Sequence, residues 1–559
     1  MEDAKFLARP SKAQYEWQDM EIGMFVHWFP EIFPPEGTPD DHPGDHRHHG
    51  YECIRVEQQA GQWDIERQKE VASWMDCPDY DPDQWVQSAI DLGAKYIVFV
   101  AKHGTGICRW QSEYGGMNFK YARYKDGKGD PLGELAEACK KRGIKLGVYL
   151  NGRTIIMNTA DRGITYDPDR QEDYNEMYRG WLTEVLSKYG DMVEVWYDGS
   201  LNLEVGDILK KYAKNAMIFQ SKFANIRWVG NEEGTASDPV WNAISRIDAV
   251  SGVSTEAQSD PDGDTWMPYE CDTTLRDQWG YNMVTKNELY SVEQLMDKYY
   301  SSVGHGVNLL INHAPNGAGR IEEEDMKRMK EFGDEIRRRF GHPIAETSGE
   351  GEIVELDLGK KQKIDHVVTM EEIAYGHRIR SYMIEGYDGE KWIRLATGIS
   401  VGHKKIDYFE AEEVEKVRIR VTTHVGEPLI RSIAAFYCGV TPKLHVKTKF
   451  NEFKLCDYGY ASYDINTLIA TMDFDVTPYV TVAGQYRIWF RDEDVNHFEI
   501  DKIWLESNGM RVDEYLKRTD DPLVFDVFAP GGADSLKIHV TSKPRKEGVN
   551  GVVIFARVD

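Results

Sequence analysis

The chain has 559 residues, of which 41% are hydrophobic and 12% aromatic, and it carries a formal net charge of -27. One compact core does not grow to this length, so several domains are expected. The acidic balance argues against a nucleic-acid partner, which requires a basic face, and against docking on anionic lipid. A neutral, polyhydroxylated ligand is compatible with this charge. The 15 Trp and 30 Tyr residues suit sugar binding, because aromatic rings pack on the apolar faces of sugars.

The cysteines and the N-terminus bear on the cellular compartment. Seven widely spaced cysteines without a CxxC pair favour free, mostly buried thiols over a disulfide framework or a zinc site. No apolar run is long enough to span a membrane, so no membrane insertion is expected. The first residues, Met1 to Lys5, do not form a signal peptide. The cellular location is left open: periplasmic or secreted if a leader was removed, otherwise cytoplasmic. The oligomeric state is also left open.

Apolar strands alternate with amphipathic helices from Met24 to about Phe340. The strands are continuous apolar runs, as expected for parallel strands buried on both faces. No glycine fingerprint follows the first strand, which argues against a Rossmann sheet. We therefore predict a (β/α)8-like barrel over residues 1–340. The expected strands are 24–29, 96–101, 146–150, 193–198, 216–220 and 307–311, and the expected helices are 83–92, 135–142, 172–189, 205–213, 292–303 and 321–340.

The pattern changes at Gly341, where short apolar runs separated by turn signals begin. Asp388-Gly389 lies between two such runs and indicates a hairpin. These runs predict an all-β module over residues 341–440 and a second β-rich module over residues 441–559. The expected fold class is multidomain, with an N-terminal barrel followed by two β-sandwich modules.

Histidines and aromatic residues lie at the carboxyl ends of four predicted barrel strands. Because a parallel barrel gathers the carboxyl ends of its strands around one pocket, these side chains should surround Asp198, which ends the fourth of these strands. They would supply hydrogen-bond donors for hydroxyl groups and rings for stacking. The four strand ends are His27-Trp28, Lys102-His103, Tyr149-Leu150-Asn151 and Trp196-Tyr197-Asp198.

Hydrolysis of a glycosidic bond in such a pocket requires a second carboxylate beside Asp198. Glu232 and Glu233 lie in the run 226–234, and Glu270 lies in the run 266–272. Neither run shows periodicity, so both are interpreted as irregular loops over the barrel mouth.

These motifs together resemble glycoside hydrolase family 29, the α-L-fucosidases. The similarity extends over most of residues 15–340. The module from Glu352 to Tyr437 resembles a galactose-binding-like, discoidin-type (F5/8 type C) β-sandwich that is often appended to one branch of this family. The matching segments are 23–28, 93–96, 101–103, 108–110, 194–199, 226–234, 279–282, 308–310 and 319–321.

The resemblance implies a retaining exo-glycosidase that removes fucose from a fucosylated oligosaccharide or glycoconjugate by double displacement, without cofactor or metal. Asp198 would be the nucleophile and Glu232 the acid/base, with Glu270 in reserve, and a retaining pair should lie roughly 5 Å apart. Arg227 is expected to orient the acid. The same mechanism on another glycoside and a catalytically silent carbohydrate-binding protein are the alternatives. The implied substrate-binding residues are His27, Trp28, His103, Tyr149, Trp196 and Arg227.

Two positions depart from the family pattern. Gly104 stands where relatives carry a histidine, and Phe29 stands where they usually carry glycine. Both departures concern the choice of sugar or linkage. In addition, four histidines cluster within residues 34–67. We interpret this segment as a polar loop that lines or caps the pocket; the alternative, a metal site, lacks the spacing of a known zinc motif. These histidines are His42, His46, His48 and His49.

Overall fold

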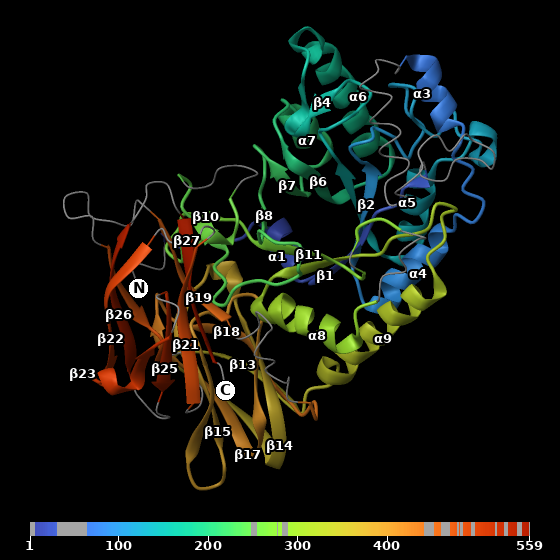
Figure 1. Cartoon of the computed structure of the whole chain (residues 1–559). Coiled ribbons are helices and arrows are strands. Elements are labelled where there is room, and N and C mark those ends of the chain that lie inside the picture. Colours follow the sequence, from blue (N-terminus) through green and yellow to red (C-terminus); the bar gives the residue numbers. More distant parts are fainter. Residues whose placement is uncertain are drawn as a thin grey trace.

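The computed structural model describes residues 6–30, 64–247, 254–276, 278–281 and 289–440 throughout, and a set of shorter segments beyond them. The later segments are 452–459, 470–477, 480, 484–492, 498–519, 523–529, 535–544 and 550–557. The histidine cluster of residues 42–49 lies outside the described residues. Figure 1 shows a barrel with helices packed around most of it, followed by two β-rich modules.

Eight parallel strands form the barrel in the hydrogen-bonded order β7-β6-β3-β2-β1-β12-β11-β8. The order follows the chain around the ring, so the barrel is nearly closed, with one seam between β7 and β8. The expected barrel architecture is therefore confirmed in its coarse form. The strands are β1 (Ile22–Val26), β2 (Tyr96–Lys102), β3 (Lys145–Leu150), β6 (Met192–Leu201), β7 (Met217–Ser221), β8 (Arg227–Trp228), β11 (Tyr269–Thr274) and β12 (Asn308–Asn312).

Helices cover most of the barrel, and their ends carry ordinary caps. The carboxylate of Asp81 caps the helix before β2, and Gly93 ends that helix with a left-handed φ of 97°. In the described residues no α-helix lies between β7 and β8 or between β8 and β11. In the connection from β8 to β11, the short strands β9 (Ala243–Ile244) and β10 (Thr265–Trp266) pair with each other. The helices are α1 (Lys12–Gln18), α3 (Ile65–Ala72), α4 (Pro82–Leu92), α5 (Pro131–Arg142), α6 (Gln171–Lys188), α7 (Gly206–Tyr212), α8 (Val292–Ser301) and α9 (Glu323–Phe340).

The first β module packs against the barrel. Its six antiparallel strands are ordered β13-β18-β14-β17-β15-β16 around an apolar core. Tyr300 of α8 hydrogen-bonds the ring of buried His366 at 2.7 Å, and Arg431 of the module pairs with Asp19 at 2.6 Å. The strands are β13 (Ala345–Glu350), β14 (Ile353–Glu371), β15 (Ile379–Tyr387), β16 (Trp392–Gly398), β17 (Lys405–His424) and β18 (Leu429–Phe436).

The second β module contains two antiparallel sheets, ordered β19-β27-β21-β25-β24 and β20-β26-β22-β23. Buried side chains from both sheets form one apolar core, as in a sandwich. The antiparallel modules thus agree with the expected β-sandwich class. The strands are β19 (Glu452–Gly459), β20 (Ala470–Asp475), β21 (Gly484–Asp492), β22 (Phe498–Ser507), β23 (Met510–Arg511), β24 (Leu516–Arg518), β25 (Val524–Ala529), β26 (Leu536–Pro544) and β27 (Asn550–Arg557).

Two local expectations about the barrel need correction. The first strand ends at Val26, so His27 lies just beyond it rather than within it. Residues 227–228 and 269–272, expected to be loop, lie in the barrel strands β8 and β11. Five cysteines in the described part of the chain are buried free thiols, as expected. Among the helices that the structure describes, none has the length and apolar character needed to cross a bilayer.

Candidate active site

The carboxylate of Asp198 lies at the barrel mouth, on the inward side of β6. The Tyr149 hydroxyl donates to Asp198 Oδ2 at 2.9 Å, and the Asn151 amide approaches the same oxygen at 3.4 Å. Directly below, Trp196 stacks on Tyr149 with ring centres 5.6 Å apart and on Phe219 at 3.8 Å. Asp198 is therefore a carboxylate held from one side by donors, above an aromatic floor.

The backbone after Asp198 turns sharply. Gly199 and Ser200 have φ angles of 68° and 70°, a conformation that a non-glycine residue adopts only at a cost. Gln220 of the neighbouring strand β7 accepts a hydrogen bond from the Gly199 amide at 3.0 Å. The pairing of β6 with β7 shifts register between Trp196 and Leu201, so this turn is a bulge at the end of the strand. The bulge presents Asp198 to the pocket.

Two neutral histidines line the mouth beside Asp198. His27 bonds Asn312 Oδ1 through Nδ1 at 2.9 Å, and burial lowers the pKa of His27 to about 3. His103 stacks on Tyr149 with ring centres 5.6 Å apart, and burial, aided by His27 and Arg109, holds the pKa of His103 well below its usual value. An uncharged imidazole can donate or accept a hydrogen bond, which suits a hydroxylated ligand.

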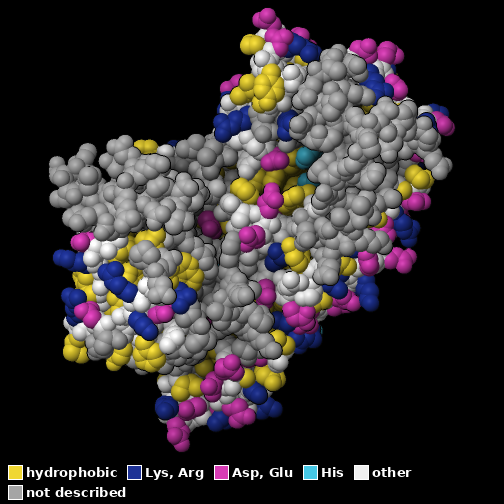
Figure 2. Space-filling model, in the orientation of Figure 1, with side chains coloured by type: hydrophobic (Ala, Val, Ile, Leu, Met, Phe, Trp, Pro, Cys, Tyr) yellow, Lys and Arg dark blue, Asp and Glu magenta, His cyan; other side chains and the backbone are white. Residues whose placement is uncertain are grey.

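Glu232 occupies the same mouth from a different direction. Its carboxylate is exposed and accepts the Trp279 indole N–H at 3.0 Å, and the Trp279 ring lies 5.0 Å from the His27 ring. Contacts through Trp279, His27 and Tyr149 therefore lead from Glu232 to Asp198. Figure 2 shows a hollow on this face with acidic, histidine and hydrophobic side chains around it.

Glu270 lies inside the barrel, below the mouth. It is the second residue of β11, is fully buried, and accepts the Tyr96 hydroxyl at 2.8 Å and the Trp196 indole at 2.9 Å. Burial raises the pKa of Glu270 and also raises that of its equally buried neighbour Glu194. The expectation of a loop carboxylate over the mouth was wrong here, because β11 turns Glu270 into the barrel interior, where it supports Trp196 from beneath.

Trp28 lies on the opposite side of the barrel wall from His27. It is fully buried and stacks on Tyr80 with ring centres 5.1 Å apart, while the Trp85 ring of α4 meets it edge-on at 5.4 Å. Successive residues of an extended chain point to opposite faces, so His27 faces the pocket and Trp28 faces the helices. The structure thus does not bring Trp28 to the mouth.

Arg227 is also buried, with 2% of its surface exposed, and its guanidinium group is bonded to backbone. It donates to the carbonyl oxygens of Met267 at 2.8 Å, Thr255 at 3.1 Å and Trp241 at 3.0 Å. These carbonyls belong to the long connection between β8 and β11. Arg227 therefore fixes this connection, instead of contacting Glu232 directly.

Several mouth residues were not anticipated. Asn312 bonds His27, Trp279 bonds Glu232, and Asp272 accepts the Trp228 indole N–H. Phe29, which the sequence had marked as a departure from the family pattern, meets the His103 ring edge-on at 5.3 Å. The signal that could have found Asp272 is its spacing of two residues from Glu270, which places both on the same face of a strand.

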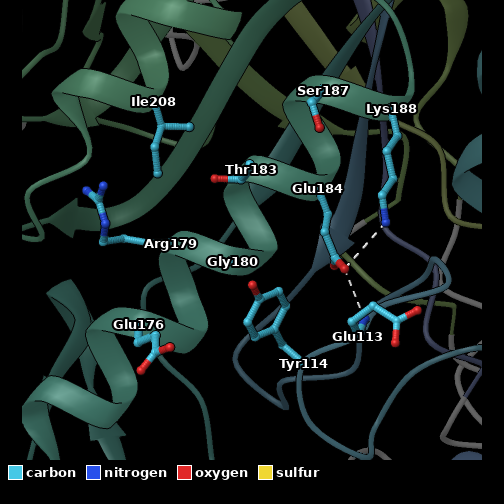
Figure 3. Close-up of a pocket in the computed structure, with 10 residues that line it drawn as sticks. All are labelled: Glu113, Tyr114, Glu176, Arg179, Gly180, Thr183, Glu184, Ser187, Lys188 and Ile208. Carbon is cyan, nitrogen blue, oxygen red and sulfur yellow. Dashed lines mark hydrogen bonds and ion pairs between the residues drawn. The ribbon is translucent and has the colours of Figure 1, made fainter.

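Two hollows differ in their relation to this site. A cavity of about 270 Å³ lies beside the turn after Asp198, and its lining includes Gly199, Ser200, Gln220 and Trp228. A larger groove of about 450 Å³ lies along α6, away from the mouth (Figure 3). Its central acid, Glu184, already accepts hydrogen bonds from Trp110, Ser112 and the Glu113 amide. Of these two hollows, the smaller cavity is therefore the one adjacent to Asp198.

One cluster of possible metal ligands occurs among the described residues, and it is remote from Asp198. Asp365, His366 and Cys438 lie together at the barrel–module boundary. Both nitrogens of His366 are already hydrogen-bonded, to Asp365 at 2.8 Å and to Tyr300 at 2.7 Å. The cluster joins two domains through hydrogen bonds.

Comparisons with known proteins identify relatives of this chain. The family model for alpha-L-fucosidase matches residues 5–339. Alpha-L-fucosidase 1 of Arabidopsis thaliana is 27% identical over 483 residues, covering 77% of this chain and 88% of the relative. A putative alpha-L-fucosidase from Bacteroides thetaiotaomicron has a similar structure, with a TM-score of 0.67, 29% identity, and coverage of 77% of this chain and 99% of that one.

Two further structures extend the comparison. A GH29 fucosidase from Ruminococcus gnavus, solved in complex with fucose, gives a TM-score of 0.63 at 26% identity and covers 77% of this chain and 95% of that chain. A family 29 member from a rumen bacterium is 21% identical, covers 99% of this chain and 96% of that one with a TM-score of 0.64, and shows the fold alone. The chain therefore belongs to the alpha-L-fucosidase family and is a glycoside hydrolase.

Proposed function

We propose that the chain is a retaining exo-α-L-fucosidase acting on fucosylated oligosaccharides or glycoconjugates. The observation that carries this proposal is the arrangement of Asp198, held by Tyr149 and Asn151 at one side of a mouth that Glu232 enters from another side. The complex of the Ruminococcus gnavus relative with fucose supports fucose as the sugar.

In this mechanism Asp198 attacks the anomeric carbon while Glu232 gives its proton to the leaving oxygen. The glycosidic bond breaks, and a glycosyl-enzyme ester forms on Asp198. Glu232, now a carboxylate, takes a proton from water, whose oxygen attacks the same carbon and releases Asp198. The two inversions together retain the configuration of the sugar.

The other mouth residues hold the sugar. His27 and His103 are neutral and can bond hydroxyl groups, and Tyr149 both bonds Asp198 and stacks on Trp196. Glu270 keeps the Trp196 indole in place from below. We assign Arg227 a supporting role, because its bonds fix the connection that follows Glu232 in sequence.

Substitution of the two carboxylates tests this proposal. Asp198→Ala should lower turnover by several orders of magnitude in a folded protein. Glu232→Ala should lower the turnover of natural glycans far more than the turnover of activated aryl fucosides, and added azide should restore turnover. Glu233→Ala is the matched control, since it removes the neighbouring exposed acid of the same loop and should leave turnover near normal. Near-normal turnover of a folded Asp198→Ala variant would refute the assignment.

A different glycoside is the second candidate, and the surroundings of His103 favour it. His103 Nδ1 is buried and has no hydrogen-bond partner among the described residues. The next residue, Gly104, supplies no side chain, and Phe29 packs against the His103 ring. Turnover of a panel of nitrophenyl glycosides separates this candidate from fucoside hydrolysis, and inactivity on the whole panel would favour a silent binding protein.

We assign the module over residues 341–440, which resembles a discoidin-type sandwich, a supporting role. It bonds the connection between β8 and β11 at several points. Lys405 pairs with Asp238 at 2.5 Å, the Asn242 amide donates to His377 at 3.1 Å, and Ser400 donates to the Val240 carbonyl at 2.9 Å. The module therefore supports the segment to which Arg227 is anchored.

A further inference from the structure

Asp272 is a buried carboxyl group on the acid side of the site. It follows Glu270 by two residues on β11, so both side chains face the barrel interior, with Asp272 nearer the mouth. Only 3% of its surface is exposed. The Trp228 indole donates to Asp272 Oδ1 at 2.7 Å.

The loop that carries Glu232 is fixed to the same strand around Asp272. The Val229 amide donates to the Glu270 carbonyl at 3.1 Å, and the Gly234 amide donates to the Asp272 carbonyl at 3.0 Å. Residues 229–234 therefore arch over the part of β11 that contains Asp272, with Glu232 between the two attachment points.

The surroundings of Asp272 disfavour its charged form. The pKa of Asp272 is raised to about 8 in total: burial raises it most, the Trp228 hydrogen bond opposes the rise, and the nearby acids Glu270 and Glu232 contribute to it. The neighbouring strand β8 contributes the neutral Trp228, and β12 contributes the neutral Leu310 opposite Asp272. The charged groups that act on Asp272 are thus acidic.

We propose that Asp272 is a positioning residue which carries a proton in the working enzyme and thereby keeps Trp228 and the Glu232 loop in their catalytic arrangement. This inference rests on the proposed role of Glu232. If Asp272 lost its proton, an unpaired negative charge would lie between Glu232 and Glu270 in a site nearly closed to water. Relief of that charge would require water to enter or the Trp228–loop arrangement to open.

The test compares Asp272→Asn with the wild type from pH 5 to 9.5, with an aryl fucoside as substrate. Asparagine keeps an acceptor for the Trp228 indole but cannot ionise. The ratio of kcat/KM between variant and wild type should be constant below about pH 7 and grow tenfold per pH unit above about 8. Because the ratio cancels any ionisation shared by both proteins, it isolates Asp272. Glu233→Gln, which removes an exposed charge from the same loop, should give a constant ratio.

Thermal unfolding gives a second readout that does not depend on fucosidase activity. The unfolded carboxyl ionises near its usual pKa, whereas folded Asp272 holds its proton to about pH 8. The wild type should therefore lose stability relative to Asp272→Asn as pH rises from about 4 to about 8, with no further change above. Asp272→Leu, which lacks the acceptor for Trp228, should lower kcat more than it changes KM.

Two results would overturn the inference: a variant-to-wild-type ratio of kcat/KM that stays constant across the pH range, or a pH-independent difference in Tm. If the protein hydrolyses no fucoside but the Tm difference still varies with pH, the proposed function fails while the proton on Asp272 is supported.

Discussion

Replacement of Glu270 separates a buried structural acid from a catalytic one. Glu270→Ala leaves the Tyr96 hydroxyl and the Trp196 indole without their acceptor in a fully buried site. An unmatched buried donor costs ~1–3 kcal/mol, so the two together should lower the free energy of unfolding by ~2–6 kcal/mol, before any cavity is counted. Chemical denaturation, followed by tryptophan fluorescence, measures this loss.

Glu270→Gln is the matched variant. The amide oxygen can accept from Trp196, and the amide nitrogen can donate to Tyr96 or to the Glu194 carboxyl, so folding should persist. Because burial raises the pKa of Glu270 and of Glu194, the wild type loses stability as pH rises, and Glu270→Gln should become relatively more stable towards alkaline pH.

Kinetics decide the role of Glu270. The folded Glu270→Gln variant should turn over natural glycans and aryl fucosides to a similar extent relative to wild type, and azide should not affect it. A folded Glu270→Gln variant that loses turnover of natural glycans only, and regains it with azide, would refute the reasoning. Glu270 would then be the acid/base in place of Glu232.

Three further predictions concern the sugar, the pH dependence and the first β module. Gly104→His should improve turnover of simple aryl fucosides about fivefold, equivalent to one neutral hydrogen bond of ~1 kcal/mol, and lower turnover of larger glycans; equal kinetics of both proteins on both substrates would contradict it. Because burial lowers the pKa of His27 to about 3, unfolding should become easier as pH falls from about 6.5 towards 3, and Tm of His27→Gln should decline less over this range; parallel Tm curves would argue against it. A chain ending at residue 340 exposes the α8–α9 face and should melt at lower temperature while any soluble product retains aryl fucosidase activity; its complete inactivity would show that the module completes the site.

The barrel could be predicted because its strands obey a simple physical rule. Parallel strands covered on both faces are continuous apolar runs, and such runs as 96–101 stand out in the sequence. The strand β11 escaped prediction because it breaks the rule. Glu270 and Asp272 alternate with Cys271 on a fully buried strand, so a segment that reads as a polar loop lies in the interior.

The candidate site was predictable only in part, because the sequence does not show which way a side chain points or how far along the chain its partners lie. Sequence could place a carboxylate and histidines at strand ends, but it could not show which of His27 and Trp28 faces the pocket, since that depends on the exact end of β1. Nor could it show that the long side chain of Arg227 is captured by carbonyls 14 to 40 residues farther along the chain. Such contacts depend on the path of an irregular connection.

Identification of the covalent intermediate tests the central claim most directly. A 2-fluoro-fucosyl fluoride should form the glycosyl-enzyme readily but release it slowly, because the fluorine destabilises both oxocarbenium-like transition states while the good leaving group speeds only the first step. Mass spectrometry of the digested protein should find one fluorofucosyl group, on the peptide containing Asp198 and absent from the Asp198→Ala variant. A label on another carboxylate, or turnover of fucosides with inversion and no label, would contradict the account.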